Sequence, residues 1–418
     1  MKMRNDQMWQ ELRKEMDKIK VVDTHEHLGK ELPIFRPSKK QKMDLMRFIS
    51  YSYLYGDLVS SGMKPIALNR LAWDDIKPHL ESVSTTSYYK YIVKALQDLY
   101  GLEGDQLTDA NWELISKRIA DKNEKHVEWE LQILDKMNIH RMLLEISEKC
   151  VLKTDLVEDE RLVQIINFEE LIMGGLTTAK KILHRNAETF DDYLSALDVA
   201  FDMAVENGAI GVKSSFAYLR NISYDKVEKS EARKIFDYGI RHATPSELKL
   251  FQDFMMHEVC EKCAEYNLPY EFHTGLHAGN FNTLKNSHPL LLENLFKEYK
   301  KVDFVLFHGG YPYIHEVGVL AKYFPNVYLD ACWLSDISIS AYKTALSEWL
   351  EIVPSNKIFA WGGDQMLIEH SYASLLLAKD LIADVLVNKI NSGYFNRNVA
   401  LSVMKKLLNQ NACNLYRL

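Results

Sequence analysis

Two histidines separated by one residue, His25 and His27, follow the apolar run IKVVD at residues 19–23. Side chains at positions i and i+2 of a β-strand lie on the same face, so both imidazoles would point the same way. Two neutral imidazoles that converge at the end of a strand are typical ligands of zinc or a similar divalent ion. An isolated HxH pattern would fit two solvent-facing histidines equally well, so the interpretation depends on the rest of the chain.

Four further ionisable residues stand at the ends of other apolar runs: Lys213 ends AIGVK, His273 follows LPYEF, His308 follows VDFVLF and Asp364 follows KIFAWGG. In a (β/α)₈ barrel the carboxyl ends of all strands form one ring around one mouth. Burying these groups together requires a metal ion or mutual pairing to offset their lost hydration. The sequence therefore predicts one metal centre from His25, His27, Lys213, His273, His308 and Asp364.

Eight short runs rich in Val, Ile, Phe and Tyr could position these residues, and helical patterns separate them. They span 19–25, 139–146, 161–168, 209–215, 268–274, 302–308, 326–332 and 357–363. Strands that alternate with helices indicate parallel βαβ units. We predict an α/β fold, a (β/α)₈ TIM barrel that forms a single domain over residues 1–418. Residues 40–130 read as several helices, a helical insertion after the first strand over the active-site face.

Composition narrows the class of protein. The formal net charge is −7 and the pI is near 6.1, which gives no basic footprint for nucleic acid or an anionic membrane. There is no apolar run of about 18 residues, and the charged first residues do not resemble a signal peptide. Five scattered cysteines fit free thiols in a reducing compartment. We expect a cytoplasmic protein with a small-molecule substrate and no nucleic-acid or membrane partner; homo-oligomers are compatible with these data.

The segments DTHEHL, FHTGLHAGN, HGGYPYIHEVGVLAKYFPNVYLD and WGGDQ resemble the amidohydrolase superfamily, within it the amidohydrolase-2 branch. The chain is similar to the amidohydrolase domain fused to glutamine-synthetase-like proteins and, more distantly, to uronate isomerases. The resemblance implies that His25, His27 and Asp364 bind a first metal and that Asp364 is the general base. It makes His273 a metal ligand, and His308 a ligand of a second metal or an electrophilic group. Lys213 would be either a bridging carbamate or an ammonium that binds a substrate carboxylate.

Four residues are candidates for substrate binding, each with a structural alternative: Arg220, Tyr218, His277 and Trp333. Arg220 could clamp a carboxylate or form a salt bridge. We expect one or two divalent ions, with Zn²⁺ the best match to the ligands, and hydrolysis of an amide, ester or lactone of a small polar or acidic molecule by metal-activated water. The alternatives are a decarboxylase, a uronate-type isomerase and a non-catalytic binding barrel.

Overall fold

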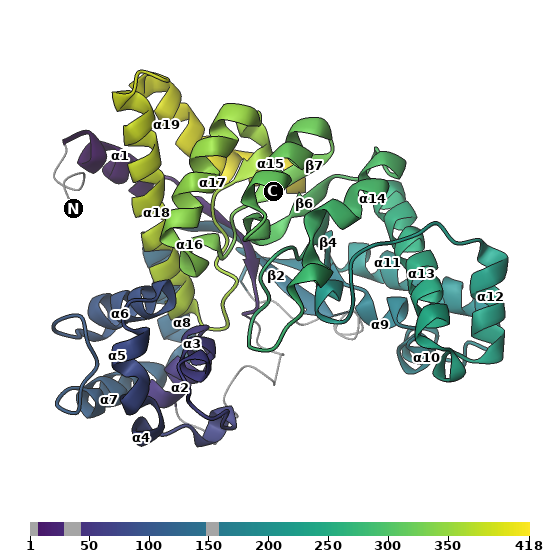
Figure 1. Cartoon of the computed structure of the whole chain (residues 1–418), viewed down its shortest axis with the longest axis horizontal. Coiled ribbons are helices and arrows are strands. Elements are labelled where there is room, and N and C mark those ends of the chain that lie inside the picture. The colour runs from purple at the N-terminus through teal and green to yellow at the C-terminus, as the bar shows by residue number, and fades with distance from the viewer. Residues whose placement is uncertain (1–6, 29–42, 148–158) are drawn as a thin grey trace.

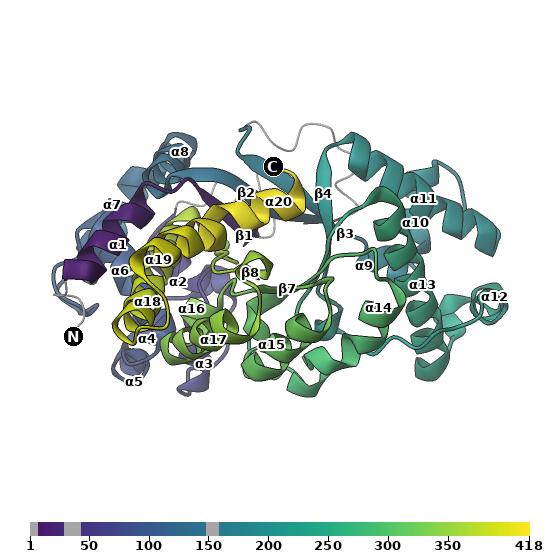
Figure 2. The same cartoon turned by 90° about the horizontal axis from the view of Figure 1, so that it is seen from above.

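The computed structural model describes residues 7–28, 43–147 and 159–418. Eight parallel strands pair in the order in which they occur along the chain, and helices surround them (Figures 1 and 2). The strands are β1 (Val21–Glu26), β2 (Ile139–Ser147), β3 (Leu162–Asn167), β4 (Ala209–Ser214), β5 (Tyr270–Phe272), β6 (Phe304–Leu306), β7 (Val327–Asp330) and β8 (Ile358–Phe359). Each lies inside or overlaps a predicted run. The predicted TIM barrel with an insertion after the first strand is therefore confirmed.

Most strand residues are buried, as expected for a parallel sheet that helices cover, and β3 is the most exposed of the eight strands. One apolar cluster joins side chains of several strands to the C-terminal helix α20 (Asn411–Tyr416) and includes Val22, Leu143, Ile165, Val305, Phe359, Leu415 and Tyr416. The phenol of Tyr416 also donates to the buried carboxylate of Glu271 on β5 at 2.7 Å. The last helix of the chain therefore completes the packing of the barrel strands.

The insertion between β1 and β2 is helical, and its helices lie at the lower left of Figure 1. It contains α2 (Leu45–Ser50), α3 (Leu54–Ser60), α4 (Trp73–Ile76), α5 (Leu80–Val83), α6 (Ser87–Tyr100), α7 (Trp112–Asn123) and α8 (His126–Met137). Helix α6 begins after the N-cap Thr86 and ends at Gly101, which has φ 65°. Its buried face packs against α18 (Ile368–Asn391), so the insertion is attached to the barrel through that helix.

The remaining helices follow the other strands or flank the chain ends. They are α1 (Gln7–Asp17), α9 (Glu169–Ile172), α10 (Leu176–Leu183), α11 (Phe190–Glu206), α12 (Lys229–Tyr238), α13 (Pro245–Tyr266), α14 (Glu293–Glu298), α15 (Ile314–Tyr323), α16 (Leu334–Ile337), α17 (Ile339–Ile352) and α19 (Arg397–Lys405). Capping boxes fix the starts of α11 and α13, where Thr189 pairs with Asp192 and Thr244 with Glu247.

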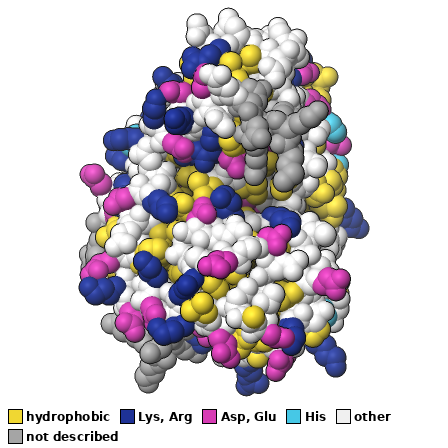
Figure 3. Space-filling model, turned by 90° about the vertical axis from the view of Figure 1, so that its left-hand side faces the viewer, with side chains coloured by type: hydrophobic (Ala, Val, Ile, Leu, Met, Phe, Trp, Pro, Cys, Tyr) yellow, Lys and Arg dark blue, Asp and Glu magenta, His cyan; other side chains and the backbone are white. Residues whose placement is uncertain are grey.

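Charged side chains of both signs are interspersed on the face in Figure 3, with small hydrophobic areas between them. This pattern is in line with the modest net charge of −7. Within the described ranges, no helix combines the length and the apolar character that crossing a bilayer requires.

Candidate metal centre

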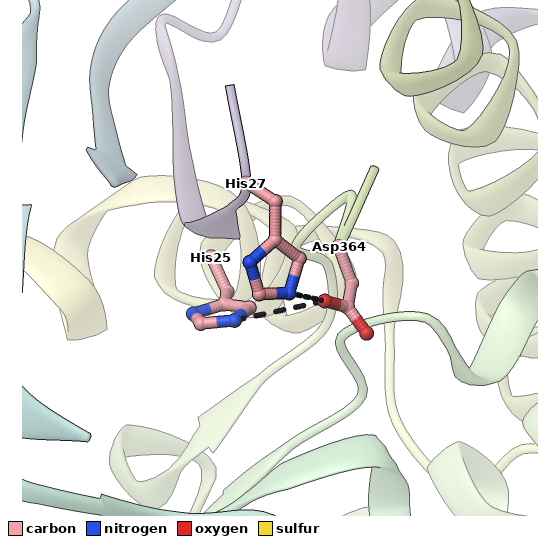
Figure 4. A group of neighbouring side chains, drawn as sticks. All are labelled: His25, His27 and Asp364. Carbon is pink, nitrogen blue, oxygen red and sulfur yellow. Dashed lines mark ion pairs between the residues drawn. The ribbon is translucent and has the colours of Figure 1, made fainter. Parts of the chain in front are cut away.

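His25, His27 and Asp364 meet where the chain beyond β8 returns to β1 (Figure 4). The backbone N–H of Asp364 donates to the carbonyl of His25 (2.8 Å), and that of His27 donates to the carbonyl of Gln365 (3.1 Å). One carboxylate oxygen, Asp364 Oδ1, lies 2.9 Å from His27 Nε2 and 3.6 Å from His25 Nε2. The side chain of His25 is fully buried, whereas that of His27 is 27% exposed. The group therefore has one open side.

The backbone at this site adopts an unusual conformation. His308, Trp333 and Asp364, which follow β6, β7 and β8, have φ values of 62°, 61° and 54°. Left-handed backbone is unfavourable for side chains other than glycine, and such residues cluster at functional sites. Gly363, just before Asp364, approaches β1 so closely that a Cβ atom there would overlap the carboxylate of Glu26. The WGGD segment therefore needs its glycine to bring Asp364 to the histidines.

The rings of His273 and His308 form a second group. His273 Nδ1 lies 2.9 Å from His308 Nε2. The other nitrogen of each ring, here called the outer nitrogen, faces a backbone carbonyl. His273 Nε2 is 2.8 Å from the carbonyl oxygen of Leu276, and His308 Nδ1 is 3.2 Å from that of Cys332. If each outer nitrogen carries the hydrogen that its carbonyl accepts, the inner nitrogens present two lone pairs to each other. A cation bound by both would relieve that repulsion, so this pair fits a metal site.

Burial and nearby charges set the protonation states at the site. Burial lowers the pKa of His25 to about 4, with a further contribution from the charge of Lys213, and burial lowers the pKa of His308 to about 3. Burial alone would raise the pKa of Asp364, but the hydrogen bond from His27 and the nearby His308 hold it below its ordinary value. For His27, burial lowers the pKa, but the hydrogen bond and the charge of Asp364 outweigh that effect and raise it, so a metal would displace a proton from this ring. Neutral His25 and His308 and an ionised Asp364 are the forms that bind a divalent ion. The residues present therefore fit the expected metal.

Lys213 on β4 also reaches the group. Its side chain is 2% exposed, and its Nζ lies 3.4 Å from His25 Nε2 and 4.7 Å from the centre of the Phe307 ring. The structure thus brings together the six residues that the sequence assigned to the metal centre, in two adjoining groups. Asp364 connects them, because its second oxygen lies 3.8 Å from His308 Nδ1.

The sequence analysis missed Glu145 on β2, whose Oε2 lies 3.8 Å from Lys213 Nζ and 3.4 Å from His25 Nε2. Burial raises its pKa, but the charge of Lys213 and the neighbouring imidazole of His25 outweigh that effect and hold the pKa below its ordinary value. A signal was present, because Glu145 stands near the end of the predicted strand 139–146, as the other ionisable residues do in theirs.

The helical insertion contributes aromatic residues that the sequence analysis also missed. The phenol of Tyr53 donates to the carbonyl of Asp364 at 2.5 Å, and its ring centre lies 4.3 Å from that of Trp333. Tyr88 of α6 stacks on Trp333 at 6.2 Å, and the Trp333 ring lies 5.3 Å from His308. Trp333, a predicted substrate contact, is therefore buried beneath two half-buried tyrosines of the insertion, next to His308.

The other three predicted substrate contacts differ in their placement. The ring of Tyr218, which is 40% exposed, lies 4.8 Å from His273 and 4.6 Å from His277. Both residues therefore flank the second histidine pair. Arg220 is engaged elsewhere: it donates to Gln252 and to two backbone carbonyls, and it forms a salt bridge with the buried Asp253. Arg220 therefore forms a salt bridge, which was the alternative to its predicted role in binding a substrate carboxylate.

The chain is similar to known proteins in sequence. Residues 225–418 match the model of a family described as amidohydrolase. Protein fluG from Emericella nidulans is 30% identical over 245 residues, which cover 55% of this chain. The match covers only 28% of that relative. The predicted similarity to the amidohydrolase superfamily is confirmed.

Solved structures share the fold over nearly the whole chain. A uronate isomerase from Thermotoga maritima has a TM-score of 0.81 at 16% identity and covers 99% of this chain and 98% of its own. A glucuronate isomerase from Caulobacter crescentus has a TM-score of 0.80 at 14% identity, with coverages of 98% and 94%. A Lactobacillus casei protein provisionally described as a metal-dependent hydrolase has a TM-score of 0.69 at 18% identity, with coverages of 97% and 97%. At these identities the likeness shows the fold.

Proposed function

We propose that this chain, with its amidohydrolase-superfamily fold, is a metal-dependent hydrolase that cleaves an amide, ester or lactone bond of a small polar molecule. One observation carries the proposal: the Asp364 carboxylate lies between the two histidine groups. Its Oδ1 is 2.9 Å from His27 Nε2, and its Oδ2 is 3.8 Å from His308 Nδ1. A carboxylate placed in this way can both hold a metal and exchange a proton with a reacting water.

His25, His27 and Asp364 would hold a divalent ion, with His273 and His308 as the second group. The bound ion supplies a water of near-neutral pKa and polarises the carbonyl of the substrate. Asp364 would accept the proton of that water and return it to the leaving group. Zn²⁺ suits the imidazole and carboxylate ligands, and a small-molecule substrate suits a largely buried group that is open on one side.

The substrate would enter from the side on which His27 and Tyr218 are partly exposed. Tyr218 would contact it there, together with His277, while Trp333 and Tyr53 would supply aromatic surface beside His308 and Asp364. Because Arg220 is held by Asp253, Lys213 is the predicted cation beside the histidines that could attract an acidic group of the substrate.

A second candidate is a uronate-type isomerase. It is favoured by the likeness to the Thermotoga maritima uronate isomerase, which covers 99% of this chain and so includes the insertion. An isomerase would move a proton between neighbouring carbons of the substrate without adding water. The hydrolase comes first because the position of Asp364 between two histidine groups is suited to the activation of water.

Mass spectrometry of the products separates these reactions. The zinc-loaded protein would be incubated with N-acyl amino acids, esters, lactones, aromatic carboxylates and uronates. Hydrolysis adds one water to the substrate mass, isomerisation leaves the mass unchanged, and decarboxylation removes carbon dioxide. We expect a lactone to give one product that is heavier by one water, and an amide or ester to give two products whose masses sum to substrate plus water. The Asp364→Asn variant should not turn over these substrates. Turnover of a uronate at constant mass, without hydrolysis of the other substrates, would favour the isomerase instead.

A further inference from the structure

The backbone of Asp364 is held from two sides. Its N–H donates to the carbonyl of His25 on β1 at 2.8 Å. Its carbonyl accepts from the phenol of Tyr53 at 2.5 Å. Tyr53 is the N-cap residue of α3, so this second bond comes from the helical insertion. Because Asp364 is buried, removal of the phenol hydroxyl would leave its carbonyl without that donor in a place with little access to water.

The residues on either side of Asp364 are bonded to side chains of β1. The N–H of Gly363 donates to Asp23 Oδ1 at 3.0 Å, and the N–H of Gln365 donates to Glu26 Oε2 at 2.6 Å. Between these two anchors, Asp364 adopts a left-handed backbone with φ 54°. A residue other than glycine keeps such a conformation only where its surroundings hold it there. The bond from Tyr53 acts on the very peptide group that carries this strain.

Tyr53 is itself fixed against the same part of the chain. Its ring centre lies 4.3 Å from that of Trp333 and 5.5 Å from that of Tyr88. The backbone N–H of Trp333 donates in turn to the carbonyl of Gly362 at 3.0 Å. Because turning the hydroxyl away would break these ring contacts, the packing directs it to the Asp364 carbonyl.

We propose that Tyr53 is a positioning residue of the metal centre, whose hydroxyl holds the Asp364 peptide in the conformation that brings the carboxylate to His25 and His27. The inference rests on the proposed metal-dependent function. The ligand atoms of the three residues lie within 4.8 Å of one another, and Asp364 Oδ1 is 2.9 Å from His27 Nε2. A rotation of the Asp364 peptide would move its carboxylate away from both rings. Tyr53 therefore acts on the metal through Asp364.

Zinc binding tests the assignment. Metal-free protein would be titrated with Zn²⁺ by calorimetry in the presence of a competing chelator. Tyr53→Phe removes the hydroxyl and keeps the ring, and we expect its zinc affinity to fall by about tenfold, the lower end of the loss seen when outer groups of a metal site are removed. Tyr55→Phe is the matched control, because the Tyr55 phenol bonds to the N–H and the carbonyl of Ile66 inside the insertion. Its zinc affinity should equal that of the wild type.

A cobalt spectrum separates positioning from a general loosening of the insertion. Co²⁺ in place of zinc reports the arrangement of its ligands through its visible absorption. We expect cobalt-saturated Tyr53→Phe to differ from wild type in this spectrum, and Tyr55→Phe to match it. Wild-type zinc affinity or a wild-type cobalt spectrum in Tyr53→Phe would overturn the inference, and so would equal changes in Tyr55→Phe. The proposed hydrolase would stand in those cases, whereas a wild-type protein that binds neither ion would refute the function and this inference together.

Amide hydrogen exchange of the wild type supplies the test if circular dichroism shows that Tyr53→Phe is unfolded. An element that favours metal binding is itself stabilised by the metal, since the coupling is reciprocal. Zinc should therefore slow exchange in α3 (Leu54–Ser60), which begins directly after Tyr53. Equal exchange of these amides with and without zinc would contradict the proposal.

Discussion

His273 Nδ1 and His308 Nε2 face each other at 2.9 Å, while a backbone carbonyl lies beside the outer nitrogen of each ring. Burial lowers the pKa of both imidazoles, so an imidazolium ion is unfavourable on either ring at neutral pH. The arrangement suits the proposed second metal position, which adjoins the group around His25 through Asp364. The proposed metal content of the protein depends on whether both groups bind an ion.

Replacing His308 tests the second group. We expect His308→Ala to lower the zinc content of the purified protein, because His273 alone cannot hold an ion on that side. The ion at His25, His27 and Asp364 should remain. Elemental analysis of wild type and variant measures this, and His315→Ala, a change of an exposed histidine on α15, is the control. Equal zinc content in His308→Ala and wild type would show that His308 is not a ligand.

Asp364→Asn should greatly reduce turnover. The amide cannot accept the proton of the reacting water, and loss of a general base costs about 10²–10⁴-fold in rate. Zinc affinity should also fall, because the anionic ligand is gone. Steady-state kinetics on the best substrate from the screen provide the measurement, with the exposed Asp121→Asn as the control. Retention of wild-type kcat at full zinc occupancy would remove Asp364 from the mechanism.

Acid sensitivity should depend on His370, a fully buried residue on α18. Burial lowers its pKa to about 3 from an ordinary value of 6.5. Between these values the unfolded chain binds a proton that the folded protein does not, so stability is lost as the pH falls below 6.5. The loss is at most about 1.4 kcal/mol for each pH unit.

His370→Phe should remove this contribution, since the ring already packs against the Phe48 ring at 4.4 Å. Urea unfolding of metal-free protein between about pH 5 and pH 7 would then show a smaller loss of stability in the variant than in wild type. His126→Gln, a change at an exposed position, should follow the wild type. Parallel pH dependence of wild type and His370→Phe would disprove the role of this histidine.

Gly363→Ala should destabilise the protein, because the added methyl group overlaps the Glu26 carboxylate. Overpacking of this kind costs about 1–3 kcal/mol, and the shift of the loop should also lower zinc affinity through Asp364. Chemical denaturation and zinc titration measure the two effects. Gly393→Ala provides a contrast, because no atom lies within 4 Å of a Cβ there, although its φ of 73° adds backbone strain. Equal zinc affinity in the two glycine variants would indicate that the close approach at Gly363 does not position Asp364.

The pattern of residues along the chain predicted the strands and the residues that end them. Each predicted run contains or overlaps an observed strand, because a buried strand needs a short apolar segment wherever it lies in the fold. Five candidate site residues could also be found, because the carboxyl end of every strand in a barrel faces the same mouth. They are His25, Lys213, His273, His308 and Asp364. The helical insertion was also predicted from the sequence, because a long interval with helical periodicity separates the first two strands.

Tertiary structure alone decided which side chains share an environment. Tyr53 reaches Asp364 because the insertion folds back over the barrel, and no local pattern encodes that contact. Arg220 follows a strand as Lys213 ends one, but its long side chain turns to Asp253. Local sequence fixes which strand carries a residue, whereas the partner of a side chain depends on the packing of elements that are distant along the chain. That packing placed Glu145 beside His25.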